Sequence, residues 1–103
     1  MKIYNIKYSP EAKGDLRKIK SYIKNNLHEP DIAERLIKKI KEAVRELKIN
    51  PEMYAVVDID RKSGIKIRRL MVDNYRVFYR VKGDWIQVIR ILYKKRNWIK
   101  IIW

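Results

Sequence analysis

The side chains of this chain that could take part in chemistry are mostly basic or aromatic. Among 103 residues, 26 are Lys or Arg and 12 are Asp or Glu, which gives a formal net charge of +14. The absence of Cys excludes disulfide scaffolds, zinc–thiolate sites and thiol nucleophiles, and a single histidine leaves little for a catalytic triad or a His-rich metal site. So large a positive charge predicts an anionic partner: a nucleic acid, an acidic protein or an anionic membrane surface.

The basic side chains are concentrated in the second half of the chain. Seven of the ten arginines follow residue 53, and no acidic residue follows Asp84. The planar guanidinium of arginine suits phosphate, whereas lysine is a flexible point charge. We therefore expect the first half to carry a solvated, mixed-charge surface and the second half to carry a binding surface.

The alternation around Asp73-Asn74 predicts a two-residue hairpin with one apolar and one basic face. The apolar face would collect Leu70, Val72, Tyr75, Val77, Tyr79 and Val81. The opposite face would collect Arg69, Met71, Arg76, Phe78 and Arg80. Three guanidinium groups would then surround one aromatic ring on the side away from the helices.

The next turn leaves two registers open. A three-residue turn at 82–84 would bring Arg90 beside Arg76 on the basic face, whereas a two-residue turn at Gly83-Asp84 would bury Arg90. Burying an unpaired arginine costs several kcal/mol, so the first register is favoured. A basic, aromatic-containing segment follows directly and consists of Tyr93, Lys94, Lys95 and Arg96. Arginine and lysine can hold a backbone phosphate while an aromatic ring stacks on an unpaired base.

The helical elements that must support this surface lie in the first half. A half-buried strand over 2–8 is followed by Ser9-Pro10-Glu11, a sequence typical of a helix start. Apolar residues at helical spacing then run to Leu27, and a second amphipathic stretch runs from Pro30 to a stop at Asn50-Pro51. The short link between the two predicts an antiparallel helical hairpin.

The rest of the chain is strand-like, which predicts the fold class. Strands are expected over 54–60, 65–72, 75–81 and 85–93. The chain is therefore expected to be a single α+β domain over 1–103, with an N-terminal strand, a helical hairpin and a four-stranded antiparallel meander. The helices would pack on one face of the sheet, and the apolar tail NWIKIIW would either dock on the body or await a partner.

Three further observations limit the alternatives. Asp58 and Asp60 share one strand face, but no third carboxylate is near in sequence, so a solvated edge strand is preferred over a metal site. His28, near the end of the first helix, is expected to stabilise that helix end. No apolar run approaches a membrane span and both helices carry acidic residues, so we expect a cytoplasmic protein that does not bind membranes.

Several segments together resemble the RelE/ParE superfamily. They are SPEAKGDLRKIKSYI, AERLIKKIKEAVRELKINP, IRRLMVDNYRVFYRV and VIRILYKKRNW, and Asn74 to Tyr79 is the most specific part. The resemblance spans nearly the whole chain. It implies a fold with two helices on one side of a curved antiparallel sheet. It also implies a toxin of a type II toxin–antitoxin pair, held inactive by an acidic antitoxin protein.

The resemblance implies two possible modes of action. RelE-like members cut mRNA in the ribosomal A site, and ParE-like members poison DNA gyrase. We expect the first mode, a metal-independent endoribonuclease that needs no cofactor because the ribose 2′-OH attacks the adjacent phosphate; gyrase inhibition is the alternative.

The site residues that the resemblance implies lie in the second half of the chain. The expected catalytic residues are Arg69, Arg76, Tyr93, Lys95 and Arg96. The expected RNA-binding residues are Phe78, Arg80, Arg90 and Lys94. The chain has Ile67 where a RelE-like lysine is expected.

Overall fold

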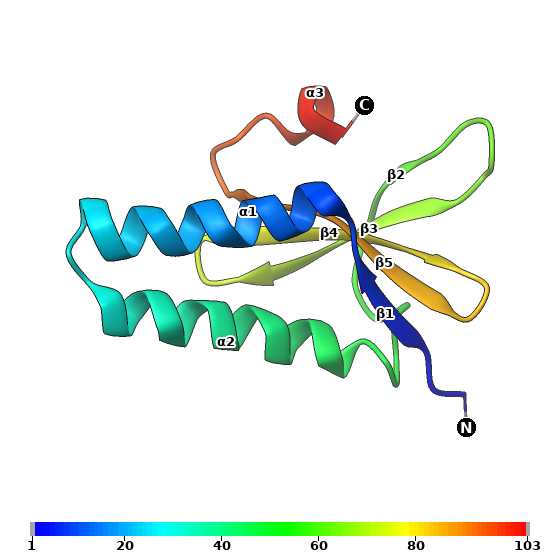
Figure 1. Cartoon of the computed structure of the whole chain (residues 1–103). Coiled ribbons are helices and arrows are strands. Elements are labelled where there is room, and N and C mark those ends of the chain that lie inside the picture. Colours follow the sequence, from blue (N-terminus) through cyan, green and yellow to red (C-terminus); the bar gives the residue numbers. More distant parts are fainter. Residues whose placement is uncertain (1, 103) are drawn as a thin grey trace.

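A five-stranded sheet forms the centre of the molecule, with a helical hairpin on one face and a short helix on the other (Figure 1). The computed structural model describes residues 2–102. Its helices are α1 (Pro10–Ser21), α2 (Pro30–Glu46) and α3 (Trp98–Ile102). Its strands are β1 (Asn5–Tyr8), β2 (Val56–Ile59), β3 (Lys66–Val72), β4 (Tyr75–Lys82) and β5 (Trp85–Tyr93). The strand order is β1-β5-β4-β3-β2, with β1 parallel to β5 and every other pair antiparallel, so the predicted α+β class is confirmed.

The helical hairpin forms as the sequence predicts. The Ser9 hydroxyl accepts a hydrogen bond from the Ala12 amide at 3.0 Å, which caps the start of α1. After α1 the chain makes a π-helical segment over Tyr22–Asn26 and reverses at His28, whose φ is 56°. His28, which is expected to stabilise the end of the first helix, therefore lies in a chain reversal and has left-handed backbone. α2 then returns alongside α1 (Figure 1).

The hairpin between β3 and β4 has the predicted register. Val72 pairs with Tyr75 and Arg69 pairs with Phe78, so the turn consists of Asp73 and Asn74. Asp73 adopts a φ of 51°, as two-residue turns require. The apolar face of this hairpin packs on the helices in the main core, and the basic face lies on the other side of the sheet.

The turn between β4 and β5 differs from the prediction. Lys82 pairs with Trp85, so the turn is the two-residue Gly83–Asp84 and not a three-residue turn. The φ of Gly83, 59°, is one that glycine adopts without strain.

With regular alternation, the two-residue turn would direct Arg90 into the core. A β-bulge between β4 and β5 prevents this. The register shifts between Phe78 and Tyr79, so that Phe78 faces Arg90 and Tyr79 faces Val88. The extra residue returns Ile91 to the core face, where it is 1% exposed, and keeps Arg90 out of the core. A bulge, rather than a longer turn, therefore avoids burying the arginine.

Helix α1 completes the edge of β5. β1 pairs with β5 only as far as Tyr8 opposite Val88. Beyond that point Ser9 donates its amide to the Val88 carbonyl at 2.9 Å and its hydroxyl to the Ile89 carbonyl at 2.7 Å. Asp15 of α1 then accepts from the Ile91 amide at 2.9 Å. Ser9 and Asp15 thus provide hydrogen-bond partners for backbone groups at this edge of β5, which a longer β1 would otherwise pair.

Asp15 also neutralises Arg90. Its two carboxylate oxygens accept from Nε and Nη2 of Arg90, each at 2.8 Å, in a bidentate pair. The Asp15 side chain is 8% exposed and that of Arg90 is 21% exposed, so most of this pair is shielded from water.

Asp15→Asn is expected to lower the free energy of unfolding by about 2 kcal/mol, because it leaves a shielded guanidinium without its counter-charge. Chemical denaturation monitored by circular dichroism would measure the change. Glu34→Gln, which removes the exposed pair with Lys20, is the control and should cost less than about 1 kcal/mol. Equal losses in the two variants would contradict a special role for Asp15.

Candidate functional site

The arginines of the predicted basic surface gather on the sheet face that carries α3, called here the outer face. β3 contributes Arg69, and β4 contributes Arg76 and Arg80. Cross-strand pairing puts Phe78 between Arg69 and Arg90, and puts Arg76 between Met71 and Leu92. Directly opposed side chains on one face are near neighbours, so the face combines guanidinium groups with an apolar centre.

Each of these arginines has a different environment. Arg80 donates from Nε to the Gln87 side chain at 2.7 Å, and Arg90 is paired with Asp15. Nε of Arg76 is buried and has no hydrogen-bond partner among the described residues. Arg69 and Arg76 are both partly buried. Neither Arg69 nor Arg76 belongs to an ion pair of the described residues, whereas Arg90 does.

Helix α3 covers the apolar centre of the outer face. Phe78 is fully buried, and the Trp98 ring stacks on it with centroids 5.1 Å apart and planes at 28°. Ile101 and Ile102 pack on the same cluster. The tail therefore docks on the body, one of the two predicted possibilities, while Trp103 lies outside the described residues. Phe78 acts as a core residue in this arrangement, so its ring is not open to a base.

Tyr93 lies on the opposite face of the sheet from the arginines. It pairs with Tyr75, and the two rings make an edge-to-face contact with centroids 5.6 Å apart. Tyr75 packs against the main core on the helix side. The sheet thus separates Tyr93 from Arg69 and Arg76, although all three are expected catalytic residues.

The segment after β5 does not join the two parts of the expected site. Lys94, Lys95 and Arg96 are exposed, and the Lys94 amide donates to the Asn74 carbonyl at 2.8 Å. Arg96 lines a groove on the helix side together with Tyr93. The residues of the expected catalytic set therefore fall into two groups.

A large groove lies on the helix side, where the sequence predicts no site. It has a volume of about 890 Å³ and runs between the closed end of the helical hairpin and the turn of β3 and β4. We call it the tip groove. Among its lining residues, Tyr22, Leu27 and Ile32 are 53%, 50% and 45% exposed. These side chains lie near the link between the helices and offer apolar surface to a partner.

A smaller pocket of about 330 Å³ lies beside α3 at the other end of the outer face. Arg80, Gln87 and Asp60 contribute its polar atoms. The Lys62 amide, which donates to Asp60, is the main cause that lowers the pKa of Asp60, with smaller help from Ser63 and Arg80. Among residues 2–102, no group of three acidic, histidine or cysteine side chains could hold a metal ion. No helix in the described part of the chain is long and apolar enough to span a membrane.

Comparison with known families gives a match over nearly the whole chain. The family model of the ParE toxin of the type II toxin–antitoxin system parDE matches residues 6–98. Among curated protein sequences, none matches significantly.

Solved toxin structures share the fold. A chain of the chromosomal ParDE toxin–antitoxin system from P. aeruginosa is 25% identical with a TM-score of 0.71, covering 88% of this chain and 96% of that one. The free E. coli toxin RelE, in a mutant form, is 16% identical with a TM-score of 0.63, covering 96% and 92%. A RelE–RelB complex from Pyrococcus horikoshii is 17% identical with a TM-score of 0.61, covering 92% and 99%.

Trp98→Ala is expected to detach α3 from the outer face, because the stack on Phe78 and its buried area are lost together. The loss of stability should be about 2 kcal/mol. Hydrogen exchange should show faster exchange in the α3 amides and little change in α1 and α2. Ile99→Ala, which truncates a side chain that is 55% exposed, is the control within the same helix. Unchanged exchange in Trp98→Ala would mean that the stack does not hold α3.

Proposed function

The chain belongs to the ParE toxin family of type II toxin–antitoxin systems, and on that premise we propose that it arrests growth by binding DNA gyrase without catalysing a reaction. It is a toxin of the RelE/ParE superfamily. Gyrase is the target that the resemblance implies for ParE-like members. The observation that carries the proposal is the separation of Tyr93 from Arg69 and Arg76 by the sheet.

Proton transfer is what the outer face lacks. Attack by a ribose 2′-OH needs a group that accepts its proton and another that protonates the leaving oxygen, each within hydrogen-bond reach. Guanidinium groups stay protonated and accept no proton. With Ile67 where a lysine is expected, and Tyr93 across the sheet, Arg69 and Arg76 could steady a phosphate but not move protons. These features favour binding over cleavage.

One observation favours the second candidate, ribosome-dependent mRNA cleavage. Arg69 and Arg76 are diagonal neighbours on one face, in the predicted register, and Arg76 keeps an unpartnered Nε. Arg80, Arg90 and Lys94 would then contact RNA, and Lys95 or Arg96 would add charge. This candidate requires Tyr93 or another proton carrier to reach the outer face, which would need the end of β5 to rearrange.

The expected partner of the toxin is an acidic antitoxin. Two of the solved structures that share the fold are described as toxin–antitoxin complexes. The tip groove has the exposed apolar side chains that a folded partner segment would bury. Its charged lining is mixed: Lys18 and Arg96 are basic, and Asp15, Glu29 and Asp73 are acidic. A segment with apolar anchors therefore suits the groove by its hydrophobicity, and its acidic residues would match the positive net charge of the chain as a whole.

Purified toxin is expected to block supercoiling by gyrase and to leave mRNA on translating ribosomes uncut. Tyr93→Phe removes only a hydroxyl, so gyrase inhibition should stay within about twofold, whereas a nuclease that uses Tyr93 would slow by about 100-fold or more. A supercoiling assay and primer extension on ribosome-bound mRNA measure the two activities. Cleavage at the A site that is lost in Arg76→Ala and Tyr93→Phe, with gyrase unaffected, would overturn the proposal in favour of the RelE-like mode.

Ile32→Asp is expected to weaken the complex with the acidic protein encoded next to the toxin by about tenfold or more, because it puts a charge into the apolar tip groove. The control is Ile49→Asp, at a position 66% exposed and outside the groove. Co-purification and titration calorimetry measure both variants. Equal affinity in the two variants would show that the antitoxin does not bind in the tip groove.

A further inference from the structure

A third groove lies between the helices at the open end of the hairpin. At this end β1 runs past the end of α2 to the start of α1 (Figure 1). It has a volume of about 550 Å³, and we call it the hairpin groove. Its apolar lining is Ile6, Tyr8, Leu16 and Val44. Its basic lining is Lys13, Arg17, Lys41, Arg45 and Lys48. More than half of the lining residues are cationic and none is acidic.

Helical spacing produces two facing rows of charge. On α1, Lys13 and Arg17 are four residues apart and therefore share a face. Lys41 and Arg45 on α2, with Lys48 just after it, repeat the same spacing. Four residues of helix rise about 6 Å. Because the helices run antiparallel side by side, the two rows line opposite walls of one groove.

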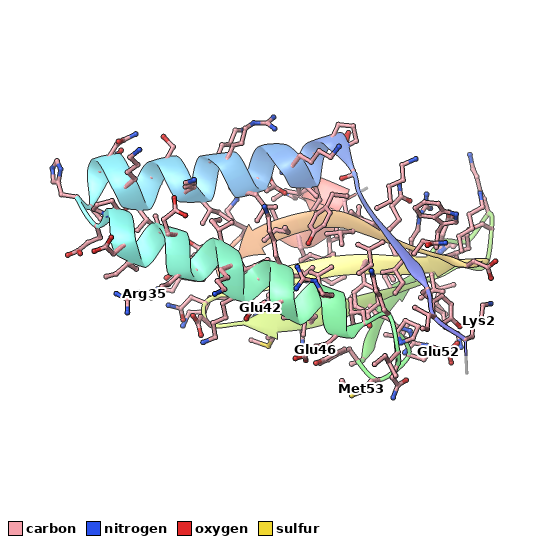
Figure 2. All side chains as sticks on the ribbon, turned by 60° about the horizontal axis from the view of Figure 1, so that its bottom comes forward. Lys2, Arg35, Glu42, Glu46, Glu52 and Met53 are labelled. Atoms are coloured by element: carbon pink, nitrogen blue, oxygen red, sulfur yellow. The ribbon has the colours of Figure 1, made fainter. Side chains whose placement is uncertain are left out.

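No neighbour neutralises these cations. None of the five groove cations takes part in an ion pair within the described residues. The ion pairs of the described residues are formed by other lysines and by Arg90. Glu42 and Glu46 of α2 lie with Arg35 along the side of the helix turned away from α1 (Figure 2). The positive potentials of the five cations therefore add within the groove. By contrast, the tip groove and the pocket beside α3 both include acidic lining residues.

We propose that the hairpin groove binds the phosphodiester backbone of a nucleic acid. Cations in two rows can contact successive phosphates, and each contact releases a condensed counterion. Tyr8 adds a neutral hydroxyl donor to the groove, and burial raises the pKa of this hydroxyl further, despite the opposing effect of Arg45. The site is separate from the outer face, and it does not depend on which target the toxin inhibits.

A nucleic acid fits this groove better than an acidic peptide. The floor residues Leu16 and Val44 are only 9% and 1% exposed, because they already belong to the main core. The groove therefore offers a peptide less apolar surface to bury than the tip groove does. Lysine is depleted in protein–protein interface cores, whereas solvated lysine and arginine suit phosphate contacts.

The test compares two double variants of α2 that remove the same charge. Lys41→Gln/Arg45→Gln removes one lysine and one arginine from the groove. The control variant, Arg35→Gln/Lys39→Gln, also removes one arginine and one lysine that are four residues apart, but both lie outside the groove. All four residues are exposed, so both variants should fold, and circular dichroism verifies this. Fluorescence anisotropy over a series of salt concentrations measures binding to labelled duplex DNA, single-stranded DNA and RNA of one sequence.

The groove variant is expected to bind about tenfold more weakly than the unaltered chain. Its slope of log affinity against log salt should fall by about 1.4 to 1.8, the loss of two phosphate contacts. The control should stay within about twofold. A preference among the three probes would identify the natural source of the phosphodiester and would support the proposal.

Two results would overturn the inference. Equal losses in the two variants would show that binding follows net charge and not the groove. Unchanged nucleic-acid binding in the groove variant, together with lost binding to a poly-glutamate peptide, would assign the groove to an acidic protein. Neither result bears on gyrase inhibition, which the supercoiling assay measures separately.

Discussion

The open backbone edge of β5 is the constraint on which the rest of the structure depends. β1 covers only the first part of that edge, and Ser9 and Asp15 satisfy the next part through the Val88, Ile89 and Ile91 backbone groups. Because both residues belong to the start of α1, the edge determines where α1 lies. α2 follows α1 through the short link at His28. The two grooves of the hairpin are therefore consequences of how one strand edge is completed.

The sheet acts as a partition between the functional groups of the molecule. Arg69, Arg76 and Arg80 lie on the outer face, and Tyr93 with its neighbour Tyr75 lies on the helix side. A reaction needs its proton carriers and its charge-stabilising groups within a few ångströms of the same atoms. In this chain the two kinds of group are on different sides, and this separation is the basis for proposing that the outer face holds an anion without transforming it.

The fold is shared with toxins of the ParDE and RelBE systems, and the fold alone therefore does not identify a target. Here Ile67 has no charge, Phe78 is buried beneath Trp98, and Arg90 is neutralised by Asp15. Each of these features reduces what the outer face offers to a ligand.

The sequence by itself determined the local features of this protein: the cap at Ser9, the two amphipathic helices, the register at Asp73-Asn74 and the apolar and basic faces of that hairpin. These follow from periodicity and turn chemistry over a few residues. Strand alternation alone is also enough to put Tyr93 on the same face as Ile91.

Only the tertiary structure decided the bulge opposite Phe78, the partner of Arg90, the docking of α3 and the cationic hairpin groove. Each joins residues far apart in the chain, such as Asp15 and Arg90, and so depends on how whole elements pack. Local propensity carries no information about that packing.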